Sequence, residues 1–345
     1  MAGRNLALAA AIAAAAAVSA APSGPAAAED YYAGKTVRIV HGGGARGSYM
    51  MYARVFAQYL PKHLKGNPTV VADTMPGAGG MNANNYGYNA APKDGSVLLM
   101  PLPGVATADL LYGAKARFDP RKFEWIGHIT GLQSAVGVWK TAPATTIEQA
   151  QKTEVVLGST GAASEVTLVP QLMNAVLGTK FKIILGYKGI GEVNLAMEKH
   201  EVEGRGGGMT SWHPLKPDWF KPEQKIAFMA QLGLKRHPLI PDVPLLSEFA
   251  KNDDDRKVLE LAARATVLSR AVAAPPGTPA ERVKELRAAF EGVMKDPGYQ
   301  ADMKKHDLMM VNQMTVEEID QFFADTQATP KPVVERLKTM LGIKS

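Results

Sequence analysis

The glycine-rich stretch that begins after residue 41 is the part of the sequence whose spacing most clearly suggests chemistry. An apolar run over residues 37–40 is followed by His41 and three glycines, and then by Gly47, before a helical pattern begins. The spacing Gly42-x-Gly44-x-x-Gly47 fits a dinucleotide-binding fingerprint, and His41 followed by three glycines fits the oxyanion turn of lipases. Each of these enzyme classes needs further residues elsewhere in the chain.

The rest of the sequence gives little support to either enzyme class. Asp73 ends the second expected strand, where a dinucleotide fold places its ribose-binding acid. A second glycine loop follows Asp73 at once, however, and an exported protein has no ready supply of dinucleotide. The lipase interpretation lacks its nucleophile, because no Gly-x-Ser-x-Gly occurs in the sequence. We expect no catalytic residues and keep a dinucleotide-dependent enzyme as an alternative.

Metal and cofactor sites are not expected either. The histidines are scattered without the short spacings that place two ligands on one face, and the chain contains no cysteine. The acidic run "KNDDDRK" at 251–257 lacks the glycine and the terminal glutamate of a calcium loop, so we expect a solvated loop there. The sequence therefore predicts no metal, no cofactor and no disulfide.

The first 28 residues read as a signal peptide. Arg4 precedes the apolar run "LALAAAIAAAAAV", and small residues follow before Ala20 and again before Ala28. The run is too short and too rich in alanine to suit a transmembrane anchor. We expect cleavage after Ala28, in preference to Ala20, and export to a bacterial periplasm.

Composition favours a folded protein of two domains. The chain has 345 residues, of which 46% are hydrophobic and 21% charged, and its formal net charge is +6. The basic excess gives weak support for an anionic partner. Basic residues are scattered without interleaved aromatic residues, so we expect no binding of nucleic acid.

Alternating strand and helix patterns predict an α/β fold in two units. Strands are expected at 36–40, 69–73, 96–100, 134–139, 154–158, 181–185 and 225–232, and a largely helical tail is expected from 278. Gly/Ser-rich turns open helices after residues 40, 74, 157 and 185. Such turns lie at the carboxyl ends of parallel strands, and their helix N-termini bind anions. Two sets of these turns predict two lobes that face each other across a cleft.

Several segments, taken in order, resemble one known family. "DTMPGAGGMNANNYGYNAAPKDGSVLLM" resembles the block that marks the substrate-binding receptors of tripartite tricarboxylate transporters, the Bug or TctC family. "FDPRKFEWIGHI", "GSTGAAS", "GYKGIGE", "LKRHPLIPDVPLLSEF" and "AAPPGTPAERVKEL" resemble later segments of that family. The resemblance covers essentially the whole chain after the signal peptide.

The resemblance implies a two-lobed periplasmic binding protein of type II topology and no enzymatic activity. Each lobe would hold a mixed or parallel sheet flanked by helices, with lobe 1 at 29–131 plus 263–345 and lobe 2 at 132–262. Such a receptor, acting as a monomer, would capture a small organic carboxylate, either a di- or tricarboxylate or an aromatic acid. It would then deliver this ligand to a membrane permease. A receptor that docks onto a sensor kinase remains an alternative.

Ligand-binding positions carried over from the family coincide with the helix-opening turns. The candidate residues are His41, Gly43, Gly44, Arg46, Ser48, Tyr49, Gly77, Ala78, Gly79, Gly80, Ser159, Thr160, Gly161, Ser164, Tyr187, Lys188, Gly189 and Gly207.

The first loop departs from the family pattern AGGGTD-x-x-AR, because Met50 replaces the acid, Tyr49 the threonine and Arg46 a glycine. We hypothesise that the ligand is more anionic or more apolar than a zwitterionic amino acid. The alternative is that Arg46 points to solvent.

Overall fold

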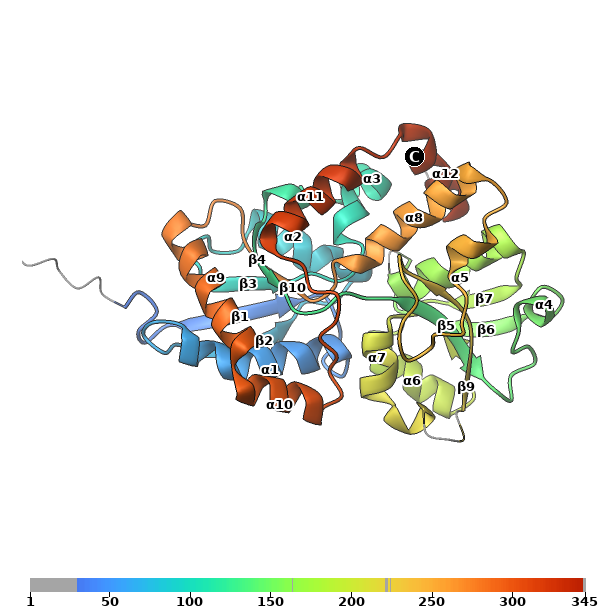
Figure 1. The fold of residues 1–345 in the computed structure, drawn as a ribbon, viewed down its shortest axis with the longest axis horizontal. Helices are drawn as coiled ribbons and strands as arrows, with labels where there is room; N and C mark the ends of the chain where they lie inside the picture. The colour runs from blue at the N-terminus through green and yellow to red at the C-terminus, as the bar shows by residue number, and fades with distance from the viewer. Residues whose placement is uncertain (1–29, 163, 221–222, 224, 344–345) are drawn as a thin grey trace, which may run out of the picture.

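Two five-stranded sheets, each flanked by helices, lie side by side (Figure 1). The computed structural model describes residues 30–343 apart from 163, 221, 222 and 224, so the signal peptide expected at 1–28 lies outside the described residues. Both sheets are mixed, which confirms the expected α/β class with a mixed or parallel sheet in each half.

The first sheet has the strand order β2-β1-β3-β10-β4. β1 pairs in parallel with β2 and β3, whereas β10 pairs antiparallel with β3 and β4. β10 therefore inserts between β3 and β4 from a point far along the chain. The strands are β1 (Thr36–His41), β2 (Thr69–Thr74), β3 (Val97–Met100), β4 (Glu124–His128) and β10 (Ala271–Ala274).

The second sheet has the order β7-β6-β8-β5-β9. β6 is parallel to β7 and β8, and β5 is antiparallel to β8 and β9. The second sheet thus repeats the pattern of the first, with a parallel part that ends in glycine turns and an antiparallel part beside it. The strands are β5 (Ser134–Trp139), β6 (Val155–Gly158), β7 (Phe181–Ile184), β8 (Gly204–Arg205) and β9 (Ile226–Leu232).

Helices cover both faces of each sheet (Figure 1). The α-helices are α1 (Ser48–His63), α2 (Met81–Asn89), α3 (Ala108–Tyr112), α4 (Ile147–Ala150), α5 (Glu165–Leu177), α6 (Ile190–Glu198), α7 (Met209–Leu215), α8 (Asp253–Val267), α9 (Ala280–Lys295), α10 (Pro297–Lys305), α11 (Val316–Gln327) and α12 (Lys331–Met340). The 3₁₀ turns are η1 (Ala78–Gly80), η2 (Val105–Thr107), η3 (Gly113–Lys115), η4 (Pro120–Lys122), η5 (Pro217–Phe220) and η6 (Leu246–Phe249).

Helix α1 illustrates how the sequence pattern builds the first core. Tyr52, Phe56 and Leu60 recur every four residues and are buried, so they form one apolar face. Phe56 packs on Phe290 of α9, with ring centroids 5.5 Å apart. The helix continues through Pro61 to His63. The proline removes a single backbone donor, and the packed apolar face maintains the helix beyond it.

The acidic run at 251–257 forms no loop, contrary to expectation. Asn252 caps α8 by accepting a hydrogen bond from Asp255 N, and Asp253, Asp254 and Asp255 occupy the first turn of the helix. Carboxylates at a helix N-terminus stabilise its dipole, which explains why this charged segment is helical.

The chain crosses between the two sheets after β4 and returns through α8 to β10 (Figure 1). The lobe boundaries given above, 29–131 plus 263–345 and 132–262, stay a proposal. In the structure, α12 packs against α8 and α5, and Val333, Val334 and Leu337 join the core of the second sheet. The helix at 331–340, which falls in the range proposed for the first lobe, thus packs on the core of the second sheet. The C-terminal segment bridges the two lobes.

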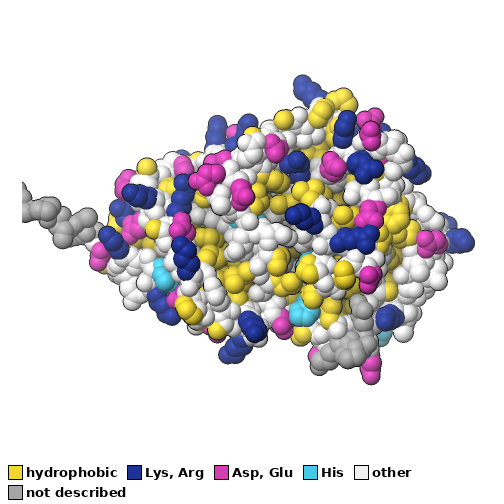
Figure 2. Space-filling view, in the orientation of Figure 1, with side chains coloured by type: hydrophobic (Ala, Val, Ile, Leu, Met, Phe, Trp, Pro, Cys, Tyr) yellow, Lys and Arg dark blue, Asp and Glu magenta, His cyan; other side chains and the backbone are white. Residues whose placement is uncertain are grey.

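Basic and acidic side chains are interspersed over the face shown in Figure 2. Within the described part of the chain, no helix has the length and apolar character needed to cross a bilayer.

Candidate ligand-binding site

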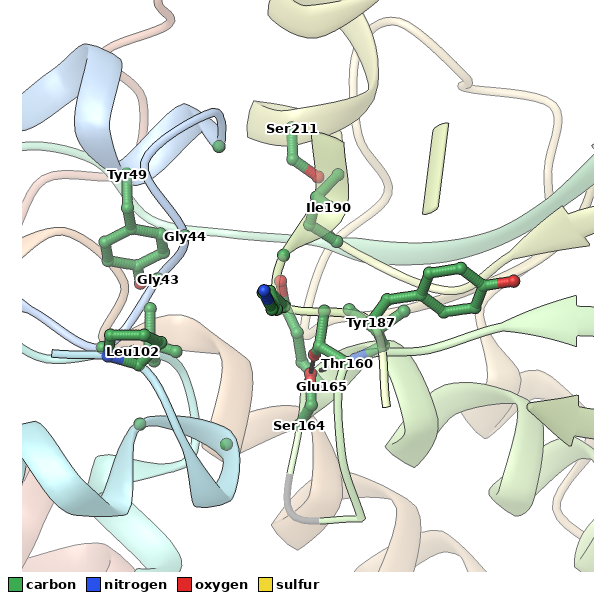
Figure 3. A pocket seen from close by; sticks show the side chains of 18 of the residues that line it. Gly43, Gly44, Tyr49, Leu102, Thr160, Ser164, Glu165, Tyr187, Ile190 and Ser211 are labelled. Atoms are coloured by element: carbon green, nitrogen blue, oxygen red, sulfur yellow. Dashed lines mark hydrogen bonds between the residues drawn. The ribbon is translucent and has the colours of Figure 1, made fainter. Parts of the chain in front are cut away.

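A cavity of about 400 Å³ lies between the two lobes, at the ends of β1, β6 and β7 (Figure 3). Tyr49 and Leu102 project into it from the first lobe, opposite Thr160, Glu165 and Ile190 from the second. Its wall consists of Gly42, Gly43, Gly44, Gly47, Ser48, Tyr49, Pro76, Gly77, Gly79, Gly80, Leu102, Pro103, Thr160, Ser164, Glu165, Val166, Gly186, Tyr187, Lys188, Gly189, Ile190, Ser211 and Arg270.

The two glycine loops of the first lobe touch each other through their backbones. A Cβ atom on Gly42 would lie 2.5 Å from the Cα of Gly80, so the loops can approach only because Gly42 has no side chain. Gly79 and Gly80 adopt left-handed φ angles of 64° and 96°. These glycines turn the chain into α2 and leave the backbone exposed to the cavity.

A second glycine contact joins the lobes. A Cβ atom on Gly44, in the first lobe, would lie 3.0 Å from the carbonyl oxygen of Lys188 and 3.2 Å from the Cα of Gly189 in the second. Gly191, in the first turn of α6, has equally little room, since its Cβ would lie 2.8 Å from the carbonyl oxygen of Arg46. The lobes therefore meet backbone to backbone beside the cavity.

Two helix N-termini from opposite lobes open at this cavity without a side-chain cap. Gly47 precedes α1 and Gly189 precedes α6, and neither residue has a side chain that could accept a hydrogen bond from the first turn of its helix. The start of α5 differs, because Ser164 Oγ accepts a hydrogen bond of 3.2 Å from Val166 N. Free N–H groups and the positive ends of two helix dipoles create a favourable environment for an anion.

Twelve of the eighteen sequence-derived candidates lie in the cavity wall. They are Gly43, Gly44, Ser48, Tyr49, Gly77, Gly79, Gly80, Thr160, Ser164, Tyr187, Lys188 and Gly189. The structure brings these residues together from loops up to 146 positions apart, counted from Gly43 to Gly189.

The other six candidates are adjacent to the wall. Arg46 and Ala78 are exposed, and Gly161 lies at the rim facing Gly79. Ser159 is buried, and its Oγ forms a hydrogen bond of 2.5 Å with Thr167 Oγ1. Gly207 adjoins the guanidinium of Arg205. His41 lies behind the first loop.

His41 and Asp73 both have structural partners. His41 Nδ1 accepts a hydrogen bond of 3.1 Å from Gly43 N, and burial lowers the pKa of the imidazole to about 4. Asp73 forms an ion pair with Arg38, which holds the pKa of the carboxyl below its usual value. The neutral histidine thus fixes the loop. Asp73 is engaged on the adjacent strand and does not line the cavity.

Sequence reasoning missed several charged and apolar residues of the wall. Arg270 and Glu165 line the cavity, as do Leu102, Pro103 and Ile190. Glu165 follows the capping serine of α5, and its carboxylate accepts hydrogen bonds from Ser134 Oγ and Gly208 N. No local motif marks Arg270, since its position follows from the insertion of β10 into the first sheet.

The arrangement suits binding rather than turnover. A micromolar ligand requires roughly 8 kcal/mol. One exposed helix end supplies about 0.3–1 kcal/mol per charge, and up to ~2 when partly buried. Several loops must therefore act on the same molecule, together with burial of its apolar surface. Among the described residues, no group of three or more acidic, histidine or cysteine side chains could hold a metal ion.

Two lobes that enclose a pocket between facing helix starts define a periplasmic binding protein of the two-lobed class. The family described as "Tripartite tricarboxylate transporter family receptor" (TctC) matches residues 52–339. The chain is 26% identical over 290 residues to a UPF0065 protein of Bordetella bronchiseptica, covering 79% of this chain and 77% of the relative.

Solved structures of two related proteins share this fold. The periplasmic binding protein BugD superposes with a TM-score of 0.69 at 22% identity, covering 90% of this chain and 98% of its own. A protein of R. palustris, solved with adipate, superposes with a TM-score of 0.66 at 19% identity, covering 90% and 98%. The chain belongs to the TctC family of transporter receptors. It is therefore a binding receptor rather than an enzyme.

Proposed function

We propose that this protein captures a small organic carboxylate between its two lobes in the periplasm and delivers it to a permease of the tripartite tricarboxylate type. The observation that carries the proposal is the convergence of two uncapped helix N-termini, from α1 and α6, on one cavity. Backbone N–H groups at such ends bind carboxylates without any catalytic side chain.

The chemistry of the wall supports an acid with an apolar portion. Tyr49, Leu102, Pro103 and Ile190 offer apolar surface between the helix starts. The solved relative with adipate shows that this fold can hold an acid with a hydrocarbon chain. The candidates to be tested for this chain are therefore organic acids with an apolar portion, drawn from dicarboxylates, tricarboxylates, aromatic acids and aliphatic acids.

Export and delivery complete the proposal. The expected signal peptide at 1–28 would place the protein in the periplasm, where it would act as a monomer. The family to which the chain belongs is named for a transporter, which supports transfer of the bound acid to membrane permease subunits.

A thermal-shift screen of the mature chain tests this function. The panel contains di- and tricarboxylates, aromatic acids, aliphatic acids and amino acids, with the corresponding amides as controls. A carboxylate present at 100 times its Kd should raise the free energy of unfolding by about 2.7 kcal/mol. A flat response to every carboxylate in the panel would overturn the proposal.

A further inference from the structure

Two arginine side chains of the described residues are fully buried, and they differ in how their charge is satisfied. Arg205 donates from Nε to Asn194 Oδ1 at 2.7 Å and from Nη1 to the carbonyl oxygen of Gly206 at 3.1 Å. Its guanidinium stacks 3.5 Å from the ring centre of Trp212. Burial lowers the pKa of Arg205 to about 9. Arg205 is thus a structural residue behind the wall of the cavity.

Arg270 is equally buried, at 1% exposure, but it lines the cavity and is incompletely bonded. Nη2 donates to Ser48 Oγ at 2.8 Å, and Nη1 donates to Ser269 Oγ. Nε has no hydrogen-bond partner within the described part of the chain, and no carboxylate there forms an ion pair with Arg270. A buried guanidinium held by two neutral hydroxyls lacks the directly bonded counter-charge that stabilises most buried ions.

The surroundings hold Arg270 in one position. The guanidinium carbon lies 4.2 Å from the ring centre of Tyr49 and 5.1 Å from that of Tyr52. The backbone of Arg270 is in the left-handed region, with φ of 54°, which is costly for a residue with a side chain. A strained backbone conformation of this kind persists only where the surrounding structure fixes the residue. Such conformations are frequent at binding sites.

Glu165 is the acidic residue of the cavity wall. Its pKa is raised by burial, which the positive charge of Arg270 partly opposes. Glu165 also stands in the first turn of α5, where its charge already stabilises the helix dipole. A ligand carboxylate placed beside this helix start would meet a negative charge of the protein.

Counting the charges around the cavity indicates the preferred charge of the ligand. The buried Arg205 and Arg270 contribute two positive charges, and the half-buried Glu165 contributes one negative charge. Lys188 is exposed, and water screens its charge. One additional negative charge therefore balances the interior, whereas two would exceed it.

Resting on the proposed function, we infer that Arg270 is the anchor for the ligand's carboxylate and that Glu165 disfavours a second one. The carboxylate binds the guanidinium hydrogens of Arg270 that Ser48 and Ser269 leave free, beside Ser48 at the start of α1. The body of the ligand lies against Tyr49, Leu102 and Ile190. The site accordingly selects an acid with a single carboxylate and an apolar body.

Calorimetric titration with a matched ligand series tests this inference. Hexanoate, adipate and hexanamide share a six-carbon chain and carry one, two and no negative charges. The most stabilising acid of the thermal-shift panel is titrated alongside them. We expect wild type to bind hexanoate more tightly than adipate and to show no measurable affinity for hexanamide.

Substitutions at Arg270 separate an anchoring role from a structural one. Arg270→Gln should weaken hexanoate binding about 10- to 100-fold, because a charge-assisted hydrogen bond is lost. Arg270→Lys keeps the charge without the planar fork and should give an intermediate loss. Arg54→Gln, at an exposed position of α1, is the matched control and should bind as wild type does.

Glu165→Gln tests whether Glu165 disfavours a second carboxylate. Unlike the Arg270 variants, this variant is expected to bind a dicarboxylate more tightly than wild type does. Removing this negative charge should improve the affinity for adipate about 3- to 10-fold relative to the affinity for hexanoate. This range corresponds to the usual strength of a partly screened interaction between two charges. Unfolding midpoints of all variants without ligand are measured in parallel. A purely structural role of Arg270 would lower the midpoint and leave the Kd unchanged.

The possible outcomes distinguish this inference from the proposed function. If wild type binds an acid and both Arg270 variants bind it within twofold of wild type, the anchoring role is overturned. Because Arg270→Lys retains the charge, it decides the question even if Arg270→Gln does not fold. If adipate binds more tightly than hexanoate, the preference for one carboxylate is overturned. If wild type binds no carboxylate at all, the proposed function fails, and this inference fails with it.

Discussion

Two buried histidines lie directly behind the cavity and hold its backbone in place. His41 Nδ1 accepts the N–H of Gly43, and His128 Nε2 donates to the carbonyl oxygen of Ser269 at 2.8 Å. Burial is the main reason that the pKa of each imidazole falls to about 4, and the charge of Arg270 lowers both further. At neutral pH both rings are uncharged, which is compatible with the positive charge beside them.

These histidines predict a loss of stability in mild acid. Between pH 6.5 and about 4, each would be protonated in the unfolded chain and neutral in the folded one, so acid favours unfolding. The free energy of unfolding should fall by about 1.4 kcal/mol per pH unit for each such histidine. Urea unfolding at pH 7, 6 and 5 measures this slope.

A pair of histidine variants controls for other titrating groups. His128→Asn should reduce the slope, whereas His306→Asn, at an exposed position, should leave it unchanged. An identical slope in wild type and in His128→Asn would contradict the role assigned to burial.

At the residue scale, the sequence predicts backbone-binding loops better than side-chain contacts. Gly44 and Gly189 were expected at the site because glycine turns carry a local signal, and both lie in the cavity wall. Arg270 carries no such signal, since nothing in its neighbouring sequence specifies that β10 will enter the first sheet. The weight placed on Arg46 has no support from its position, because its exposed side chain is not part of the wall.

At the element scale, the contact between the β1–α1 loop and the start of α6 controls how closely the lobes approach. Gly191 lies against the backbone of Arg46. Neither of these two segments can yield easily, because α6 is packed through Val193 and Met197 and the loop is fixed by His41.

Gly191→Ala is therefore expected to have opposite effects on stability and on affinity. Alanine favours a helix over glycine by up to about 1 kcal/mol, so the free protein should be as stable as wild type or more so. The added methyl group would meet the carbonyl oxygen of Arg46 at 2.8 Å when the lobes are together. Overpacking of this kind costs about 1–3 kcal/mol, which corresponds to a roughly 5- to 100-fold weaker affinity.

Leu195→Ala, at an exposed position of the same helix, provides the matched control. Ligand affinity and unfolding midpoint are measured for both variants by calorimetry and thermal denaturation. Equal affinities of Gly191→Ala and wild type would show that this contact does not govern closure.

Strand–turn–helix units could be predicted from the sequence, whereas the elements that join the lobes could not. β1, β2, β6 and β7 were expected because they are short β-branched runs that are followed by glycine-rich turns. β4 and β10 pair antiparallel across more than a hundred residues, which no local pattern encodes. The cap and acidic first turn of α8 were visible in the sequence but were interpreted as a solvated loop.

At the scale of the whole molecule, two similar sheets enclose one cavity, and the chain links them at several points. α8 leads back from the second sheet to the first. α12 then packs against α8 and joins the core of the second sheet. Enclosure of a ligand between the lobes adds apolar burial to the weak individual contributions of the helix ends.

The most direct test of this account is calorimetric titration of the mature protein with the most stabilising carboxylate of the screen. The account predicts one acid bound per chain with a micromolar or lower Kd, and recovery of the acid chemically unchanged. Absence of binding heat for every carboxylate tested, or conversion of the acid into a product, would contradict it.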